Sequence, residues 1–233
     1  MKKEQLLRGI ISYCRRLETA SCVLCGATVI PDTTVPGLCG ACIHEIRSVP
    51  GPFTLEDLPR VTAACAYGGE MKRAMEMLKI SGRRDVAVAL SRLLLRPLFE
   101  ALLEEWNCEL TDDSISDLAL VPVPGSLKGR RRRGFDQSIL LARELSPRVR
   151  PVIARRGGQA QKSLNREERL QNAHQQYHIS NFARRHWRDG HIPARVLIVD
   201  DIVTTGASIL RCAELVTALG VQDWRALTVA ARL

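Results

Sequence analysis

The chain has 233 residues, of which 45% are hydrophobic and 25% are charged. This balance is that of an ordinary globular protein, and it excludes a largely disordered chain, a collagen and a coiled coil. Its 34 Lys and Arg residues exceed its 25 Asp and Glu residues, so the net charge is +9. A basic protein favours anionic partners, such as phosphorylated small molecules, nucleic acid or an acidic membrane face.

The positive charge is concentrated in one middle segment. Residues 128–195 hold 17 basic and 5 acidic side chains, a net charge of +12. A solvated basic face is the ordinary explanation of such a run, but this concentration favours an anion-binding site. No stretch approaches the ~20 apolar residues that span a bilayer, and the charged N-terminus lacks a signal-peptide pattern. We therefore expect a cytoplasmic protein without a membrane span, whose cysteines are reduced thiols or metal ligands.

Two Cys-x2-Cys pairs lie near the N-terminus: Cys22 with Cys25, and Cys39 with Cys42. Four thiolates in tetrahedral array form the usual closed structural zinc site. An iron–sulfur cluster and a redox dithiol pair are the alternatives. The short polar loop between the pairs cannot build its own core, so zinc would supply the folding energy. We expect a zinc-ribbon module with an N-terminal helix over residues 1–50, and a linker over about 48–59.

The remainder, residues 60–233, alternates apolar strands with amphipathic helices. The predicted strands are Val61–Tyr67, Leu118–Val123, Arg195–Val199 and Arg225–Ala231. The predicted helices are Glu70–Ile80, Val86–Glu105, Gln137–Leu145 and Ala207–Leu219. This alternation predicts an α/β fold with a mostly parallel sheet and helices on both faces. Ligands of such sheets bind at the carboxyl ends of the strands.

The segment 196–208 combines a buried strand, two carboxylates, a loop of hydroxyls and glycine, and the start of a helix. A helix N-terminus offers unpaired N–H groups to a phosphate, and Gly206 permits close backbone approach. The carboxylates of Asp200 and Asp201 suit ribose hydroxyls or a Mg²⁺ held between them. An ordinary strand-to-helix turn is the alternative. The pattern is similar to the loop with which type I phosphoribosyltransferases hold phosphoribosyl pyrophosphate (PRPP).

Several further motifs occur in order along the chain: residues 121–124, 131–137 and 161–164, followed by Arg169 and Asn172. Together with the cysteine pairs and segment 196–208, they resemble the ComF family over nearly the whole chain. The resemblance implies a zinc ribbon followed by a type I phosphoribosyltransferase-like domain. This domain would include, at about residues 126–190, a flexible basic loop and a hood that closes over the ligand.

The resemblance also implies which residues bind PRPP with Mg²⁺. The ribose phosphate would be held by Asp200, Asp201, Thr204, Thr205, Gly206, Ala207 and Ser208. The pyrophosphate would be held by Pro124, Gly125, Ser126, Lys128, Arg131, Arg132, Arg133, Gln137 and Arg169. For the arginines a solvated surface is the alternative. Nothing in the sequence identifies a nucleophile or a catalytic base.

Three functions remain open at this point. One is phosphoribosyl transfer from PRPP to an unidentified acceptor, which includes an enzyme of nucleotide metabolism unrelated to DNA. Another, implied by the family's link to natural competence, is the handling of incoming single-stranded DNA through the basic segment. The last is a PRPP-sensing scaffold without turnover that contacts a protein of the competence machinery. We expect a PRPP-binding protein that acts in DNA uptake or utilisation.

Overall fold

The computed structural model describes residues 21–29, 35, 37–80, 82–107, 117–156, 166–187 and 192–232. The predicted N-terminal helix and the motif at residues 161–164 lie outside these ranges, as does the side chain of Arg169. The backbone of Arg169 belongs to helix α8 (Arg166–Gln176). No helix within the described ranges is long and apolar enough to cross a membrane.

A five-stranded sheet forms the centre of the molecule, in the order β1-β2-β7-β6-β3. Its strands are β1 (Phe53–Leu55), β2 (Leu58–Ala66), β3 (Leu118–Pro122), β6 (Arg195–Val203) and β7 (Asp223–Ala231). Four strands run parallel, and β1 pairs antiparallel with β2. The mostly parallel sheet is therefore confirmed. The stretch expected to be a linker instead contains β1 and the first residues of β2.

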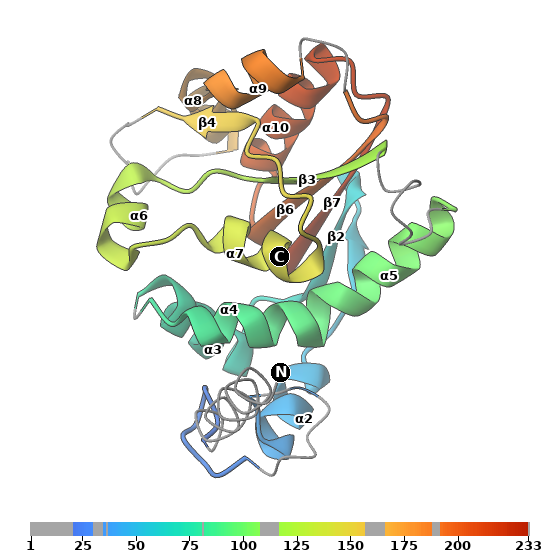
Figure 1. Cartoon of the computed structure of the whole chain (residues 1–233). Coiled ribbons are helices and arrows are strands. Elements are labelled where there is room, and N and C mark those ends of the chain that lie inside the picture. Colours follow the sequence, from blue (N-terminus) through green and yellow to red (C-terminus); the bar gives the residue numbers. More distant parts are fainter. Residues whose placement is uncertain are drawn as a thin grey trace, which may run out of the picture.

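Helices cover both faces of this sheet, as predicted (Figure 1). The helices on one face are α3 (Gly69–Lys79), α4 (Arg84–Leu90), a π-helical turn η1 (Ser91–Leu95), α5 (Arg96–Glu105) and α7 (Gln137–Leu145). The opposite face carries α8, α9 (Asn181–His186) and α10 (Ala207–Ala218), with the small antiparallel pair β4 (Ile153–Arg155) and β5 (Tyr177–Ile179). Strand alternation separates the two cores, because Leu197 contacts the first layer and Ile198 the second. We call the segment β4–α8–β5–α9 the hood.

The basic stretch after β3 folds as helix α6 (Leu127–Arg133), so the prediction of a flexible loop there is wrong. The hydroxyl of Ser126 accepts a hydrogen bond from the N–H of Gly129 at 3.1 Å, which caps the first turn. Gly134 ends the helix with a φ of 77°, a conformation that glycine adopts without strain. These local capping signals outweigh the charge repulsion within the run of arginines.

The four-cysteine module lies against α3 and contains helix α2 (Gly40–Ser48). Its buried Leu38 and Ile46 belong to the same continuous core as Met71 and Met75 of α3. The guanidinium of Arg73 also donates to the carbonyl of Leu24 at 3.3 Å. The module and the sheet domain are therefore joined by apolar packing as well as by the chain.

Candidate functional site

The loop after β6 lies between the sheet and α10. Gly206 immediately precedes α10 with a φ of 72°, and a Cβ there would lie 2.3 Å from Cδ1 of Leu58. Only glycine fits this close approach without displacing Leu58. Strand β6 continues to Val203, so Asp200 and Asp201 lie within the strand and not after Val199 as predicted.

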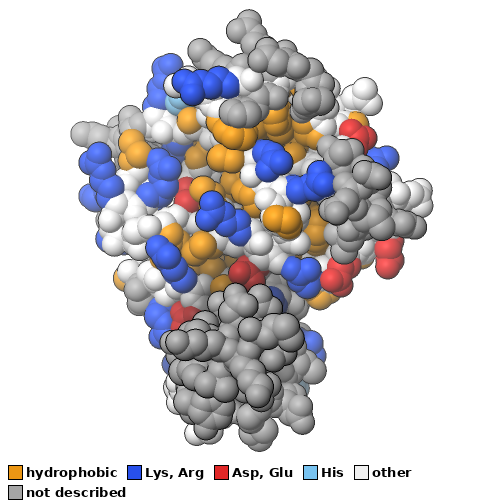
Figure 2. Space-filling model, in the orientation of Figure 1, with side chains coloured by type: hydrophobic (Ala, Val, Ile, Leu, Met, Phe, Trp, Pro, Cys, Tyr) orange, Lys and Arg blue, Asp and Glu red, His pale blue; other side chains and the backbone are white. Residues whose placement is uncertain are grey.

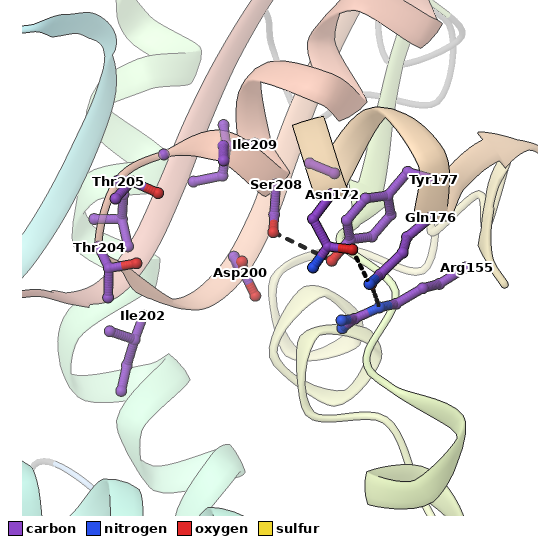
Figure 3. A pocket seen from close by; sticks show the side chains of 14 residues that line it. Arg155, Asn172, Gln176, Tyr177, Asp200, Ile202, Thr204, Thr205, Ser208 and Ile209 are labelled. Atoms are coloured by element: carbon purple, nitrogen blue, oxygen red, sulfur yellow. Dashed lines mark hydrogen bonds between the residues drawn. The ribbon is translucent and has the colours of Figure 1, made fainter. Parts of the chain in front are cut away.

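A pocket of about 250 Å³ lies between this loop and the hood. The structure brings together in its lining Asp200 and the five predicted loop residues, Thr204, Thr205, Gly206, Ala207 and Ser208. The opposite wall comes from the hood and includes Arg155, Asn172, Gln176 and Tyr177 (Figure 3). Tyr177 and Ser208 connect the two walls, because their hydroxyl oxygens lie 3.2 Å apart.

Asp200 lies deep in this pocket and is held from two sides. Its Oδ1 accepts a hydrogen bond from the hydroxyl of Ser138 at 3.0 Å and another from the N–H of Asp201 at 2.8 Å. Burial, together with the neighbouring carboxylate of Asp201, raises the pKa of Asp200 above its ordinary value. Asp200 is therefore suited to hydrogen bonding with a hydroxyl group of a ligand.

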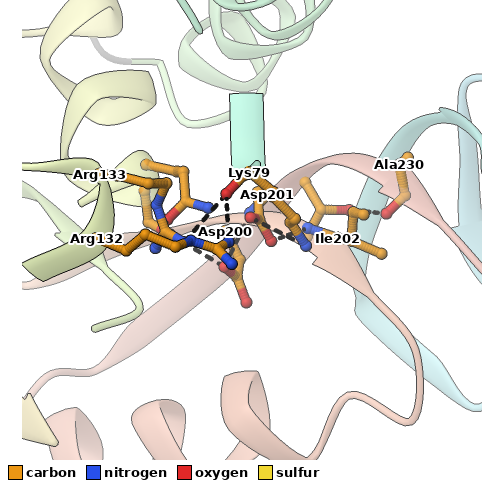
Figure 4. A network of polar contacts seen from close by, with 10 residues as sticks. Lys79, Arg132, Arg133, Asp200, Asp201, Ile202 and Ala230 are labelled. Atoms are coloured by element: carbon orange, nitrogen blue, oxygen red, sulfur yellow. Dashed lines mark hydrogen bonds and ion pairs between the residues drawn. The ribbon is translucent and has the colours of Figure 1, made fainter. Parts of the chain in front are cut away.

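Asp201 faces away from the pocket and contacts Lys79 at the end of α3 (Figure 4). The Lys79 ammonium lies 3.2 Å from Oδ2 of Asp201. The Lys79 carbonyl accepts hydrogen bonds from Arg132 at 2.8 Å and from Arg133 at 3.4 Å. The structure thus separates the two predicted carboxylate ligands, and the carboxylate of Asp201 is already paired with the ammonium of Lys79. This arrangement does not fit a Mg²⁺ held between Asp200 and Asp201.

The predicted pyrophosphate loop at residues 124–126 is held by a buried carboxylate. Oδ2 of Asp136 accepts the N–H of Gly125 at 2.8 Å, and Nε of Arg130 lies 4.0 Å from the same oxygen. Burial raises the pKa of Asp136, against the Gly125 N–H and the Arg130 charge, which lower it. Because the Asp136 side chain is only 3% exposed, it positions the loop and does not contact solvent.

The other predicted anion-binding residues occupy different positions around α6. Arg133 donates to Oε1 of Gln137 at 2.7 Å, so both side chains are engaged within the protein. Lys128, Arg131 and Arg132 are exposed on the surface. None of the predicted pyrophosphate residues belongs to the described lining of the pocket. Their binding role stays a prediction.

Sequence reasoning assigned no role to Lys79, Asp136, Arg155, Gln176 or Tyr177, although each contributes to this region. Asp136 belongs to the motif at residues 131–137, and this motif was the sequence signal that could have identified it. Arg155 and Tyr177 are brought together by the pairing of β4 with β5. Lys79 reaches Asp201 over 122 positions of sequence, a proximity that no local spacing indicates.

The four cysteines form a compact donor cluster. The Sγ atoms of Cys22, Cys25, Cys39 and Cys42 all lie within 4.8 Å of one another. The N–H of Cys42 points at Sγ of Cys39 at 3.5 Å, as in a knuckle that stabilises a thiolate. Four close sulfur donors can hold a metal ion, and the set fits a closed structural zinc site.

Comparisons with known proteins place the chain among curated relatives, although no family model matches it. It is 30% identical to the DNA utilization protein YhgH of Shigella flexneri, over 93% of this chain and 88% of that protein. The DNA utilization protein YhgH of Escherichia coli K12 is 29% identical with the same coverage. Competence protein F of Haemophilus influenzae is 29% identical over 115 residues, which are 45% of this chain and 46% of that protein.

Proposed function

The chain belongs to the ComF family, and from this premise we propose that it binds PRPP under its hood and acts on single-stranded DNA during DNA uptake or utilisation. The names of its relatives, DNA utilization protein and competence protein, support the DNA role. The pocket supports the PRPP role. Transfer of the phosphoribosyl group to an acceptor is the enzymatic form of this proposal.

One observation carries the proposal: the loop at residues 204–208, which we call the phosphate loop, lines a single pocket beneath the hood together with Asp200. The first N–H groups of α10 and the hydroxyls of Thr205 and Ser208 can bind the 5′-phosphate. Asp200 then lies where a ribose hydroxyl would follow the phosphate. The pocket, of about 250 Å³, suits small molecules and not a polymer.

The pyrophosphate of PRPP, supplied with its Mg²⁺, would lie toward the turn at residues 124–126 and toward α6. Both follow β3, the neighbour of β6, so their anion-binding groups emerge at the same carboxyl edge of the sheet. In transfer, the bond from C1 to the pyrophosphate oxygen breaks, the bond from C1 to the acceptor forms, and the pyrophosphate departs with the electron pair. Positive charge at this edge would stabilise the departing oxygens.

Calorimetric titration of zinc-loaded protein with Mg²⁺ and PRPP tests the binding proposal. Thr205→Val keeps the shape of the loop residue but removes a hydroxyl donor to the phosphate. A hydrogen bond to a charged group contributes about 1.5–3 kcal/mol, so affinity should fall about 10- to 100-fold. Thr217→Val, at the exposed far end of α10, is the matched control and should bind as the wild type does.

A folded, zinc-loaded wild type that does not bind PRPP would exclude the proposed ligand. If PRPP binds, release of pyrophosphate in the presence of candidate acceptors separates an enzyme from a sensor. Binding without release under all conditions would favour the PRPP-sensing scaffold.

A further inference from the structure

Among the described residues, the hood wall of the pocket presents one cation. Among the described lining residues, Arg155 is the only basic side chain and Asp200 the only acidic one. Figure 3 places the Arg155 guanidinium across the pocket from Thr204 and Thr205. The phosphate loop and Arg155 therefore face different parts of whatever fills the pocket.

Arg155 is held in a defined orientation by the hood itself. Its Nε donates to Oε1 of Gln176 at 2.8 Å, and its guanidinium lies over the ring of Tyr177 at 5.3 Å from the centroid. Gln176 and Tyr177 are buried, at 7% and 4% exposure, and Gln176 in turn donates to Asn172. Among the described residues, this network uses Nε and one face of the guanidinium, and the two terminal nitrogens are available to a ligand.

An arginine that served only the fold would be expected to pair with a carboxylate. No ion pair joins Arg155 to an acidic residue within the described ranges. A planar guanidinium anchored through Nε presents a fork of N–H donors that matches the two oxygens of a phosphate or carboxylate. Because the fork is already oriented, binding an oxyanion would require little further ordering of the side chain.

We propose that Arg155 binds the oxyanion of a second ligand, which enters the pocket under the hood beside the ribose phosphate. This inference rests on the proposed function, because it takes the phosphate loop to be filled by a sugar phosphate. It adds the chemistry of the other ligand, which is an anionic molecule with a phosphate or carboxylate group. Arg155 sets its specificity, and Gln176 and Tyr177 act as positioning residues.

The test uses the full zinc-loaded chain saturated with ribose 5-phosphate, which fills the phosphate loop and leaves the hood side open. Phenyl phosphate, benzoate and benzamide are then titrated calorimetrically. Wild-type protein should bind one of the two anions at least 10-fold more tightly than neutral benzamide, and the better anion identifies the oxyanion. Arg155→Ala should remove this preference, and Arg155→Lys should restore only part of it, since lysine lacks the planar fork.

Arg156→Ala is the matched control, because it removes the same charge from the adjacent, exposed position. It should retain the preference for the anion, and all three variants should bind ribose 5-phosphate within about 2-fold of the wild type. Equal affinity for benzamide and both anions, or equal loss in Arg155→Ala and Arg156→Ala, would overturn the inference. So would a 10-fold loss of ribose 5-phosphate binding in Arg155→Ala, which would place Arg155 on the sugar phosphate.

Failure of the wild type to bind ribose 5-phosphate would count against the proposed function instead. The same three probes titrated into the free protein would then test Arg155 alone. Loss of the anion preference in Arg155→Ala would still support the oxyanion site, and its persistence would overturn it.

Discussion

Asp200 and Asp201 are adjacent in sequence but have different environments. Asp200 lines the pocket and bonds to Ser138, whereas Asp201 pairs with Lys79. The difference follows from the partners that the fold brings to each side chain, which are Ser138 of α7 and the pocket for Asp200, and Lys79 of α3 for Asp201. Two carboxylates that look like one binding site in the sequence therefore differ in the fold: Asp200 lines the pocket, and Asp201 forms an ion pair with Lys79.

The raised pKa of Asp200 has a consequence for stability. The folded protein retains a proton that the unfolded chain releases near pH 4, so Asp200 lowers the free energy of unfolding as the pH rises above that value. Relative to Asp200→Asn, the wild type should therefore lose stability between pH 5.5 and pH 8. Urea unfolding of both proteins at several pH values measures this difference, and parallel curves would contradict the prediction.

Asp136 should matter for stability through Gly125. Asp136→Ala leaves the Gly125 N–H without its acceptor and removes a buried side chain, which should cost about 1–3 kcal/mol. Asp136→Asn keeps an oxygen acceptor and should retain more of the stability. Chemical denaturation of the two variants measures both effects. Equal losses in the two would show that the charge of Asp136, and not its acceptor oxygen, stabilises the loop.

At the scale of elements, α6 shows how local signals override charge. Five cations within seven residues suggested a solvated loop, yet the segment is a regular helix that Ser126 caps at its start and Gly134 ends. Lys79 and Asp136 then fix its orientation, because Arg132 and Arg133 donate to the Lys79 carbonyl and Arg130 lies near Asp136. The helix therefore presents its remaining cations, Lys128 and Arg131, to solvent.

The cysteine module and the sheet domain should unfold together. Removing the metal with a chelator takes away the binding energy that holds the four cysteines, about 10–16 kcal/mol in isolated zinc modules. Because Leu38 and Ile46 share a core with Met71 and Met75, the loss should also lower the melting temperature of the sheet domain. Calorimetry with and without chelator measures it, and Cys39→Ser should reproduce the chelated state. An unchanged main transition would indicate that the module is energetically independent.

For the whole molecule, charge distribution is the feature that bears on DNA. Figure 2 shows Lys and Arg side chains spread over the face that carries α6. Aromatic residues make up only 4% of the chain, so base stacking is not expected to dominate. Binding of single-stranded DNA should then be weakly sequence-specific and mainly electrostatic.

Fluorescence anisotropy with a labelled single strand at increasing salt concentration tests this prediction. The logarithm of the association constant should fall linearly with the logarithm of the salt concentration. The double variant Lys128→Ala, Arg131→Ala should reduce the magnitude of this slope by about 1.4, because each lost phosphate contact reduces it by about 0.7. Arg92→Ala is the control. Arg92 belongs to the π-helical turn η1 and pairs with Glu144 of α7, so its loss should leave the slope unchanged. Affinity that does not depend on salt would exclude the electrostatic mode.

The sequence by itself determined the features that depend on neighbouring residues. These are the cysteine pairs, the alternation of strands and helices, and the strand and loop that lead through Gly206 into a helix. Such features follow from spacing, capping and backbone freedom, which are local. Local reasoning failed where a short strand, β1, replaced the expected linker, because pairing with β2 stabilises it.

Only the tertiary structure decided which side chains meet. The pairing of Lys79 with Asp201, the hydrogen bond of Ser138 to Asp200, and the position of Arg155 opposite the loop at residues 204–206 all join elements distant in the chain. They depend on strand order and on packing of the hood over α10, for which the sequence holds no local signal. Hydrogen bonds and ion pairs act over a few ångströms, so their partners are known only once the chain has folded.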